Sequence, residues 1–351
     1  MVISRTYIAT PPGATIKEQL EDRGMSQKEF ADRLGVTQKH ISHLINGVVH
    51  LTPEMALRLE MVLGIPAQFW NNLEAIYREK LARANEENEM DYDIELSKKF
   101  PYKEMMENGW IEVTKDPVER VINLRKFFEV ANLKFLNKES LAPGIACRRV
   151  SEGEKADYAL LAWAQQAKLE ARRVSVNAIN VERLQKKIPQ IRSMTRKDPE
   201  EFCPTLINIM SDCGIALIFL PHFSSSFLHG ATFYDKNKIV MGLTVRGKYA
   251  DRFWFSLFHE IGHIVLGHIG QRDGTSLKDE EDANVFARDI LIDKSSFDLF
   301  AKHRDFTKSA IIDFSESIGI DPGIVVGRLQ KEGLIDYSWH KDLMTKYEIS
   351  V

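Results

Sequence analysis

The sequence predicts a mainly helical protein with one small β-sheet, an α+β fold divided among several domains. The chain has 351 residues, which is too long for a single hydrophobic core of ordinary size. Residues 14–83 show short helical patterns broken by Gly, Pro and capping residues, and residues 99–210 are also rich in helical patterns. Runs typical of β-strands follow at 214–221, 230–235 and 238–245. This order predicts helical domains followed by a mixed domain.

The composition is that of a soluble globular protein, with 44% hydrophobic and 28% charged residues. The net charge of −3 argues against nucleic-acid binding by the chain as a whole, although a local binding surface is compatible with it. No stretch is apolar enough to span a bilayer or to serve as a signal peptide. The three cysteines, Cys147, Cys203 and Cys213, form no CxxC pair. We therefore expect a cytoplasmic protein with reduced thiols and no membrane partner.

Residues 26–48 have the pattern of two helices joined by a tight turn. Ser26 is placed to cap the first helix, with Glu29 completing a capping box. Gly35 stands where the turn requires an unusual backbone angle, and Thr37 is placed to cap the second helix. This pattern predicts a helix-turn-helix. The apolar stripe of the second helix consists of Ile41, Leu44 and Ile45.

The opposite face of that second helix carries side chains that can bond to base edges or phosphates. A helical pattern from residue 14 precedes these two helices, and further helices are predicted to begin at Pro53 and after Pro66, which gives a five-helix DNA-binding domain over residues 1–83. This segment holds ten Lys and Arg against nine Asp and Glu, so a monomer would attract phosphate weakly. A homodimer on double-stranded operator DNA is therefore the expected binding form. The predicted DNA-binding residues are Gln27, Lys28, Thr37, Gln38, Lys39, Ser42, His43 and Asn46.

Residues 24–77 resemble the antitoxin-type branch of the Xre family, the HigA-like regulators. Members of that family repress their own operon, often as dimers, and many neutralise a toxin encoded beside them. The resemblance implies a transcriptional repressor, with a cognate toxin as a candidate protein partner.

The segments between and after the motifs carry weaker signals. Residues 84–98 are polar and acidic, which predicts an exposed linker and a candidate site of self-cleavage. Residues 99–210 show no catalytic pattern, and a spacer, a dimerisation surface and a ligand sensor are all compatible with them. Residues 307–333 are predicted to form two helices that pack on the last domain. A second DNA-contacting helix-turn-helix, with Arg328, Gln330 and Lys331 exposed, is the alternative.

A second motif, His259-Glu260-x-x-His263, lies in an apolar stretch that predicts a buried helix. On a helix the two histidines share one face and can hold one cation. Glu260 is offset around the helix, so it can reach a metal-bound water rather than the metal. This is the arrangement of a zinc peptidase, in which the metal activates water and Glu260 transfers its proton to the leaving amine. A metzincin is excluded because Ile269 stands where its third histidine would be.

The third metal ligand is expected from the acidic helix at 279–292. Ala283 and Ala287 form a small-residue face that would allow this helix to approach the motif helix closely. Glu280 lies on that face and is the favoured ligand. The alternatives are Glu281 and Asp282. They are rotated around the helix axis by about 100° and 200° from Glu280.

Residues 206–300 resemble the ImmA/IrrE metallopeptidases. That family has a gluzincin-like fold, with a small sheet beside the motif helix, and its members cleave helix-turn-helix repressors in trans. One departure is Asp293, where the family commonly has a proline after the third-ligand helix. The runs that carry the resemblance are 214–221, 229–244, 252–268 and 280–292.

This resemblance implies a gluzincin-like metallopeptidase domain over residues 211–351, with one zinc ion per chain. His259, His263 and Glu280 would bind the zinc, and Glu260 would be the catalytic base. The edge strand at 229–234 would hold an extended substrate. Candidates for transition-state support near this strand are His229 and Tyr234.

The two halves together predict a sequence-specific DNA-binding regulator that carries a zinc metallopeptidase domain. The substrate of that domain would be a regulator protein, a toxin or the chain itself. The alternative is an antitoxin or repressor in which the zinc site is only structural or sensory.

Overall fold

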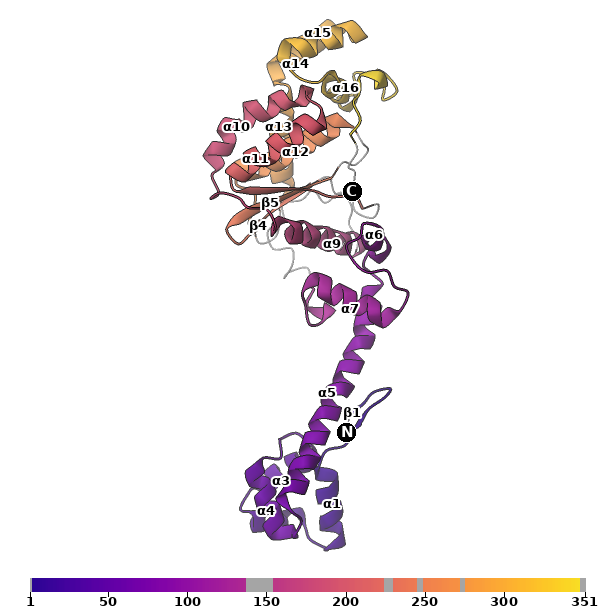
Figure 1. Cartoon of the computed structure of the whole chain (residues 1–351), viewed down its shortest axis with the longest axis vertical. Coiled ribbons are helices and arrows are strands. Elements are labelled where there is room, and N and C mark those ends of the chain that lie inside the picture. The colour runs from indigo at the N-terminus through magenta and orange to yellow at the C-terminus, as the bar shows by residue number, and fades with distance from the viewer. Residues whose placement is uncertain (1, 137–153, 224–229, 245–248, 272–274, 348–351) are drawn as a thin grey trace. The chain divides into compact units, whose positions relative to one another are not determined.

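The computed structural model describes residues 2–136, 154–223, 230–244, 249–271 and 275–347 (Figure 1). The chain divides into two compact units, residues 1–95 and residues 96–351. The described residues are mostly helical with small sheets, as the sequence predicts. Among them, no helix combines the length and the apolar character that a membrane crossing requires.

The N-terminal unit contains the predicted five helices. Its core is formed by apolar side chains from every helix, including the fully buried Ile16, Phe30, Ile41, Leu59 and Trp70. The indole of Trp70 also donates a hydrogen bond to the Ile65 carbonyl at 3.2 Å, which ties the start of the fifth helix to the loop before it. The helices are α1 (Gly13–Asp22), α2 (Gln27–Leu34), α3 (Gln38–Ile45), α4 (Pro53–Leu63) and α5 (Ala67–Ser97).

The caps predicted for the helix-turn-helix are present with one correction. The Ser26 hydroxyl accepts a hydrogen bond from the Glu29 backbone N–H at 3.2 Å, and the Thr37 hydroxyl caps α3 in the same way. Gly35 adopts the left-handed conformation, with a φ of 68°, as the turn requires. The capping box is incomplete, because the Glu29 carboxylate bonds to Arg33 at 2.6 Å instead of reaching back to the cap.

The expected linker at 84–98 is helical, because α5 continues to Ser97. The segment is rich in strong helix formers and is preceded by the i,i+4 pair of Glu79 and Arg83, 2.9 Å apart. Glu87 is held by the N-terminal hairpin, whose Thr6 donates to it from the backbone at 3.0 Å and from the hydroxyl at 2.8 Å. The argument for self-cleavage from an exposed linker therefore fails, because this backbone is engaged in a helix.

A short hairpin of β1 (Val2–Ile3) and β2 (Ile8–Ala9) precedes α1. This hairpin could not be predicted from the sequence, because strands of two residues carry no detectable alternation of apolar and polar side chains.

The second unit contains the predicted sheet, in the order β3-β5-β4. β3 (Ile215–Phe219) pairs in parallel with β5 (Lys238–Leu243), and β4 (Gly230–Asp235) pairs antiparallel with the other side of β5. The connection between β4 and β5 is tight, with Lys236 at a φ of 57°. Among the described strands, β4 therefore lies at one edge of the sheet.

Helices cover both faces of this sheet (Figure 1). On one face α9 packs so closely that a Cβ at Gly242 of β5 would lie 2.4 Å from the Trp163 ring. On the other face lies α12, whose Trp254, Leu257 and Phe258 share one core with the sheet. The helices named so far and their neighbours are α9 (Glu154–Ala171), α10 (Val181–Ser193), α11 (Pro199–Asp212), α12 (Ala250–Val265) and α13 (Leu277–Leu291).

The region 99–210 was expected to precede the mixed domain as a separate helical segment. In the structure α9 and α11 pack directly on the sheet, so they belong to the same compact unit. A simple spacer is therefore the least suitable of its three proposed roles. The other short helices of this region are α6 (Tyr102–Glu107), α7 (Pro117–Phe128), η1 (Leu133–Phe135) and η2 (Met194–Arg196).

The C-terminal helices pack against the second unit, as favoured from the sequence. Val325 and Val326 of α16 are fully buried in the core that contains α12. The alternative of a second DNA-contacting motif fails, because the Arg328 guanidinium stacks 3.8 Å from the Phe297 ring and Gln330 is buried. The helices of this part are α14 (Lys294–His303), α15 (Lys308–Ile318), α16 (Pro322–Lys331) and η3 (Lys341–Leu343).

We expect Gly13→Ala to unfold the N-terminal unit. A Cβ at this position would lie 2.1 Å from the Ile45 carbonyl oxygen at the end of α3, and backbone cannot swing away as a side chain can. The expected loss in free energy of unfolding is above about 3 kcal/mol, measured by urea denaturation of the full chain. The control is Gly64→Ala, where the Cβ meets nothing and only the left-handed backbone costs about 1 kcal/mol. Equal losses in the two variants would refute this packing.

Candidate functional site

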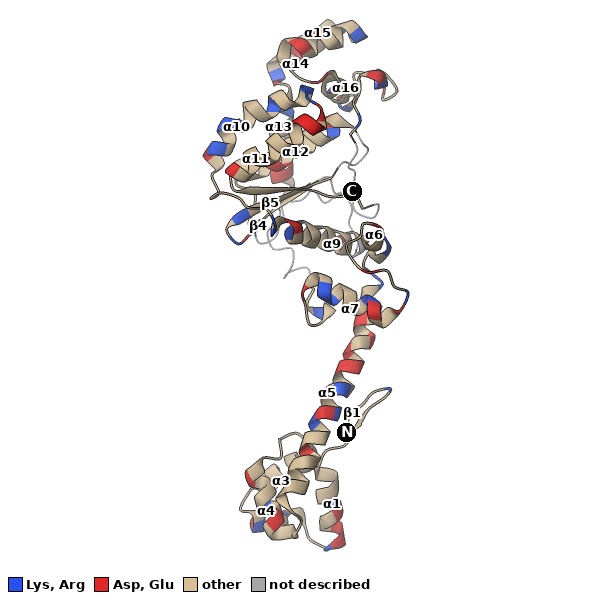
Figure 2. Cartoon of the chain, in the orientation of Figure 1, with Lys and Arg blue, Asp and Glu red and all other residues tan. Residues whose placement is uncertain are grey.

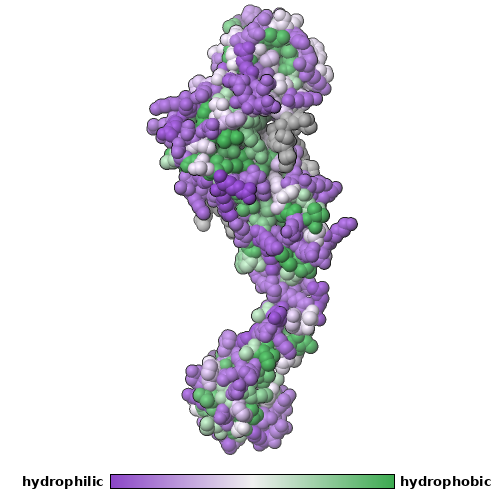
Figure 3. Space-filling view, viewed as in Figure 1, coloured by the Kyte–Doolittle hydropathy of each residue, from purple (hydrophilic) through white to green (hydrophobic). Residues whose placement is uncertain are grey.

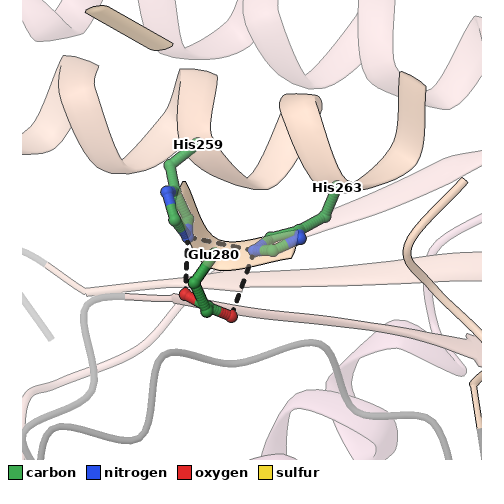
Figure 4. A group of neighbouring side chains, drawn as sticks. All are labelled: His259, His263 and Glu280. Carbon is green, nitrogen blue, oxygen red and sulfur yellow. Dashed lines mark hydrogen bonds and ion pairs between the residues drawn. The ribbon is translucent and has the colours of Figure 1, made fainter. Parts of the chain in front are cut away.

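Three side chains with metal-binding chemistry meet in the second unit. His259 and His263 project from α12 toward Glu280 of α13 (Figure 4). The Nε2 atoms of the two histidines are 3.0 Å apart, and the Glu280 oxygens lie 3.3 Å from His259 Nε2 and 3.5 Å from His263 Nε2. Both histidines are buried. The favoured third residue therefore lies beside the histidine pair, whereas both alternatives, Glu281 and Asp282, are exposed.

Small residues allow α12 and α13 to approach closely enough for this meeting. An ideal Cβ at Gly262 of α12 would lie 3.4 Å from the Ala283 Cα and 3.1 Å from the Phe286 ring. Ala283 and Ala287 are fully buried at this contact. The face of small residues noted in the sequence is thus the contact surface of α13, and Glu280 lies one turn before Ala283 on it.

The donor set fits a zinc-type cation. Zinc binds imidazole nitrogen and carboxylate oxygen, and two nitrogen ligands of one tetrahedral zinc lie roughly 3.3 Å apart. The 3.0 Å between His259 Nε2 and His263 Nε2 is close to that separation. Glu280 Oε2 is buried and lies 3.3 Å from His259 Nε2, so it points toward the same space as the histidine nitrogens and is placed to share a cation with them.

The buried surroundings determine the charge states of His263 and Glu280. Burial and the neighbouring His259 lower the pKa of His263 to about 4, so the ring is neutral at pH 7 and keeps a lone pair. Burial alone would raise the pKa of Glu280, but His259 and a 2.6 Å hydrogen bond from Thr275 outweigh it and lower the pKa. The site therefore presents neutral imidazole and ionised carboxylate.

Glu260 lies on the side of α12 that faces the sheet. The Thr232 hydroxyl of β4 donates a hydrogen bond to Glu260 Oε2 at 2.5 Å. Gly230, two residues earlier on the same face of β4, leaves room for the carboxylate, since a Cβ there would lie 2.7 Å from Oε1. The edge strand thus positions the candidate base on one side, while α12 places His259 and His263 beside it.

Burial raises the pKa of Glu260 to about 7, with a smaller contribution from the charge of Glu280. The interactions with His259 and Thr232 act in the opposite direction and do not cancel this effect. A carboxyl group that titrates near neutral pH can both accept and return a proton there. Sequence reasoning missed Thr232 and Gly230, although the two-residue period of β4 places them on one face.

The remaining residues predicted for this site differ in their exposure and surroundings. Tyr234 continues the face of β4 that carries Thr232, is about half exposed, and packs over Gly270, where a Cβ would lie 3.1 Å from its ring. Ile269 is buried in the core. His229 and Cys147 lie outside the described residues, whereas Cys203 and Cys213 are free thiols. Asp293, the departure from the family pattern, caps α14 by accepting from the Ser296 N–H at 2.9 Å.

The first unit presents the predicted DNA-binding face on α3. Ile41 and Leu44 are buried beneath it. Asn46 is held in place because its amide donates to the Ser42 carbonyl at 2.8 Å. Both acidic and basic residues lie on the helices of this unit (Figure 2). Lys28, Thr37, Gln38, Lys39 and Asn46 are exposed, and Gln27, Ser42 and His43 are half-buried.

These helices and their turn define a helix-turn-helix domain of the kind found in transcriptional regulators. A family model described as helix-turn-helix matches residues 16–70. The chain is 40% identical over 63 residues to the uncharacterized HTH-type transcriptional regulator YddM of Escherichia coli, a match that covers 18% of this chain and 67% of that protein. Through this domain the chain belongs to the helix-turn-helix family of regulators.

Two further proteins are similar to the same region. Antitoxin HigA-1 of Vibrio cholerae is 40% identical over 57 residues, which are 16% of this chain and 53% of that protein. An addiction module antidote protein of a HigA family from Coxiella burnetii has a solved structure with 27% identity and a TM-score of 0.22, covering 24% of this chain and 92% of that one. The chain thus spans between about half and two thirds of the curated relatives named here.

We expect Glu260→Gln to stabilise the metal-free protein at high pH. The carboxyl pKa is about 7 in the folded state and 4.5 for an ordinary glutamate in an unfolded chain, so the folded protein holds an extra proton between these values. Folding stability from this group is therefore lost as pH rises from 4.5 to 7. Because the variant has no carboxyl group here, its free energy of unfolding should exceed that of the parent by on the order of 3 kcal/mol at about pH 8. Near pH 4.5 the two values should differ little.

The measurement is chemical denaturation of both proteins in the presence of a chelator at several pH values. Because the pKa of His263 is lowered, its contribution to the free energy of unfolding increases as the pH rises toward 6.5. This contribution is the same in both proteins and cancels in the difference between them. A difference in the free energy of unfolding that does not change with pH would contradict a raised pKa of the buried Glu260 carboxyl.

Proposed function

We propose that the chain is a sequence-specific transcriptional repressor that binds double-stranded operator DNA through α3. The observation that carries this proposal is the exposed face of α3, where Gln38 and Lys39 stand at the N-terminal end of the helix. Membership of the helix-turn-helix family supports it. The similarity to a protein named as an antitoxin makes a cognate toxin a candidate partner.

A homodimer is part of this proposal. The near balance of acidic and basic residues in the first unit makes binding by one copy weak, and two copies would double the phosphate contacts. Apolar residues reach the surface of this unit (Figure 3). Leu57 and Met61, one turn apart on α4, are 56% and 80% exposed and supply apolar area of the kind that dimers bury.

We expect Gln38→Ala to weaken specific DNA binding by about 5- to 150-fold, because an amide that bonds a base edge contributes about 1–3 kcal/mol of discrimination. Lys39→Ala should instead weaken binding to all sequences and reduce the salt slope by about one. The measurement is fluorescence anisotropy with a DNA duplex selected from a random pool, at several salt concentrations. Lys103→Ala, an exposed lysine of the second unit, is the control. Unchanged binding by both α3 variants would exclude α3 as the reading helix.

For the second unit we propose a zinc metalloendopeptidase of the HExxH-plus-glutamate class. The meeting of His259, His263 and Glu280, with Glu260 buried beside them, carries this proposal. When bound, zinc would supply the Lewis acidity that lowers the pKa of water toward neutrality. Glu260, held by Thr232, would take the proton from the attacking water and deliver it to the leaving amine.

The proposed substrate is a peptide segment of a regulator, a toxin or another copy of this chain. Among the described strands none pairs with the outer edge of β4, so this edge can pair with an extended peptide, and Thr232 on the same strand lies beside the candidate base. The helical state of residues 84–97 makes that segment a poor substrate, because a cleaved peptide must be extended at the site.

A structural or sensory zinc site is the second candidate function. His263 is fully buried, and His259 and Glu260 are 6% and 2% exposed, so little of the cluster is open to a polypeptide. Such a site would hold α12 and α13 together without hydrolysis.

We expect the purified protein to hold about one zinc per chain by mass spectrometry, and His263→Ala and Glu280→Ala to lose it. Glu281→Ala is the matched control, since this exposed neighbour should leave the zinc content unchanged. Glu260→Gln should also retain zinc but should not cleave a fluorogenic peptide library that the parent cleaves. Zinc in the parent without any cleavage would favour the structural or sensory role, and absence of zinc would overturn both.

A further inference from the structure

A third histidine, His268, lies directly behind the candidate metal ligands. It is buried, and its Nδ1 atom lies 3.2 Å from the Nδ1 atom of His263. Its other nitrogen, Nε2, faces Asp279 Oδ1 at 3.6 Å. The three side chains form a line in which His268 stands between the ligand histidine and a carboxylate.

The backbone fixes this line. Gly267 takes the left-handed conformation, with a φ of 75°, after α12 ends, and the His268 N–H bonds back to the His263 carbonyl at 2.8 Å. Asp279 is anchored in the first turn of α13, where its Oδ2 accepts from the N–H of Ser276 at 2.8 Å and from the Ser276 hydroxyl at 2.7 Å. Its other oxygen, Oδ1, is the one that faces His268.

Protonation chemistry then determines where the protons sit. A neutral imidazole carries one N–H donor and one acceptor nitrogen. The 3.6 Å between His268 Nε2 and Asp279 Oδ1 is longer than a hydrogen bond, but the carboxylate can only accept, so it favours the tautomer with the proton on Nε2 and the lone pair on Nδ1. The facing Nδ1 of His263 then acts as the donor, which leaves the lone pair of His263 Nε2 for a metal. Glu280 Oε1, 3.5 Å from the same Nε2, attracts a proton there and so opposes this tautomer until a cation lies between them.

We propose that His268 and Asp279 are positioning residues that fix the tautomer and the ring orientation of His263, so that its Nε2 is preset to bind the metal. This inference rests on the proposed zinc site and assigns the residues that tune it. Partners that hold the far nitrogen of a metal-ligating histidine raise its basicity and orient its ring.

Asp279→Asn is the sharpest test, because the cap dictates how the amide must lie. The Ser276 N–H requires an oxygen, so the amide oxygen would keep the cap and the amide nitrogen would face His268. A donor at that position would reverse the tautomer of His268, and His263 would then carry its proton on Nε2. The expected effect is a roughly 10- to 100-fold loss of zinc affinity, measured by competition with a chromophoric chelator.

Two further variants separate this role from a structural one. His268→Asn can place its side-chain oxygen as an acceptor beside His263 Nδ1, so it should retain more zinc affinity than His268→Leu, which cannot. Asp282→Asn, an exposed carboxylate on the same helix, is the control and should bind zinc as the parent does. Thermal unfolding of each metal-free variant identifies any that fail to fold.

Nitrogen-15 NMR of the histidine rings gives a readout that needs no metal. In the metal-free parent we expect the His263 proton on Nδ1, and in Asp279→Asn on Nε2. A proton on Nε2 in the parent, or equal zinc affinity in all folded variants, would overturn the inference. A parent that binds no zinc would overturn the proposed metal site, while the tautomer of His263 would still be decided by the NMR measurement.

Discussion

The close packing of α12 on α13 is the constraint on which the candidate metal site depends. Gly262 and Ala283 lie where the two helices are in contact: a Cβ at Gly262 would already lie 3.4 Å from the Ala283 Cα and 3.1 Å from the Phe286 ring, so a bulkier side chain there would have to displace Phe286 or α13. Burial of a carboxylate and two imidazoles is unfavourable because these groups lose water. The apolar core around them contributes the stabilisation that offsets this desolvation. The same approach brings the cap of α13, through Asp279, to the loop that ends α12.

Electrostatics within this packed space divides the polar groups into two kinds. His263 stays neutral and Glu280 stays ionised, which suits them as ligands, whereas the buried Glu260 has its pKa raised to about 7 and suits proton transfer. Glu260 differs from Glu280 because it faces β4, where Thr232 is its hydrogen-bond donor and Gly230 leaves space for it. One helix thus presents ligands and a candidate base to different neighbours.

The sequence predicts those features that depend on local spacing. The caps at Ser26 and Thr37, the left-handed Gly35 and the strands around the sheet follow from such patterns and are present. Local spacing does not show which distant residues meet. The contact of Thr232 with Glu260 and the position of His268 behind His263 are therefore visible only in the folded structure. Residues 84–97 were misjudged because an acidic composition suits both an exposed linker and a solvated helix such as α5.

X-ray absorption at the zinc K-edge of the purified full chain tests the central claim most directly, because it reports the atoms bound to the metal. The account predicts a first shell of nitrogen and oxygen only, with two imidazole ligands from His259 and His263, a carboxylate from Glu280 and one further oxygen. Sulfur in the shell, or a shell without imidazole, would show that the metal binds elsewhere and would contradict the assignment of these residues.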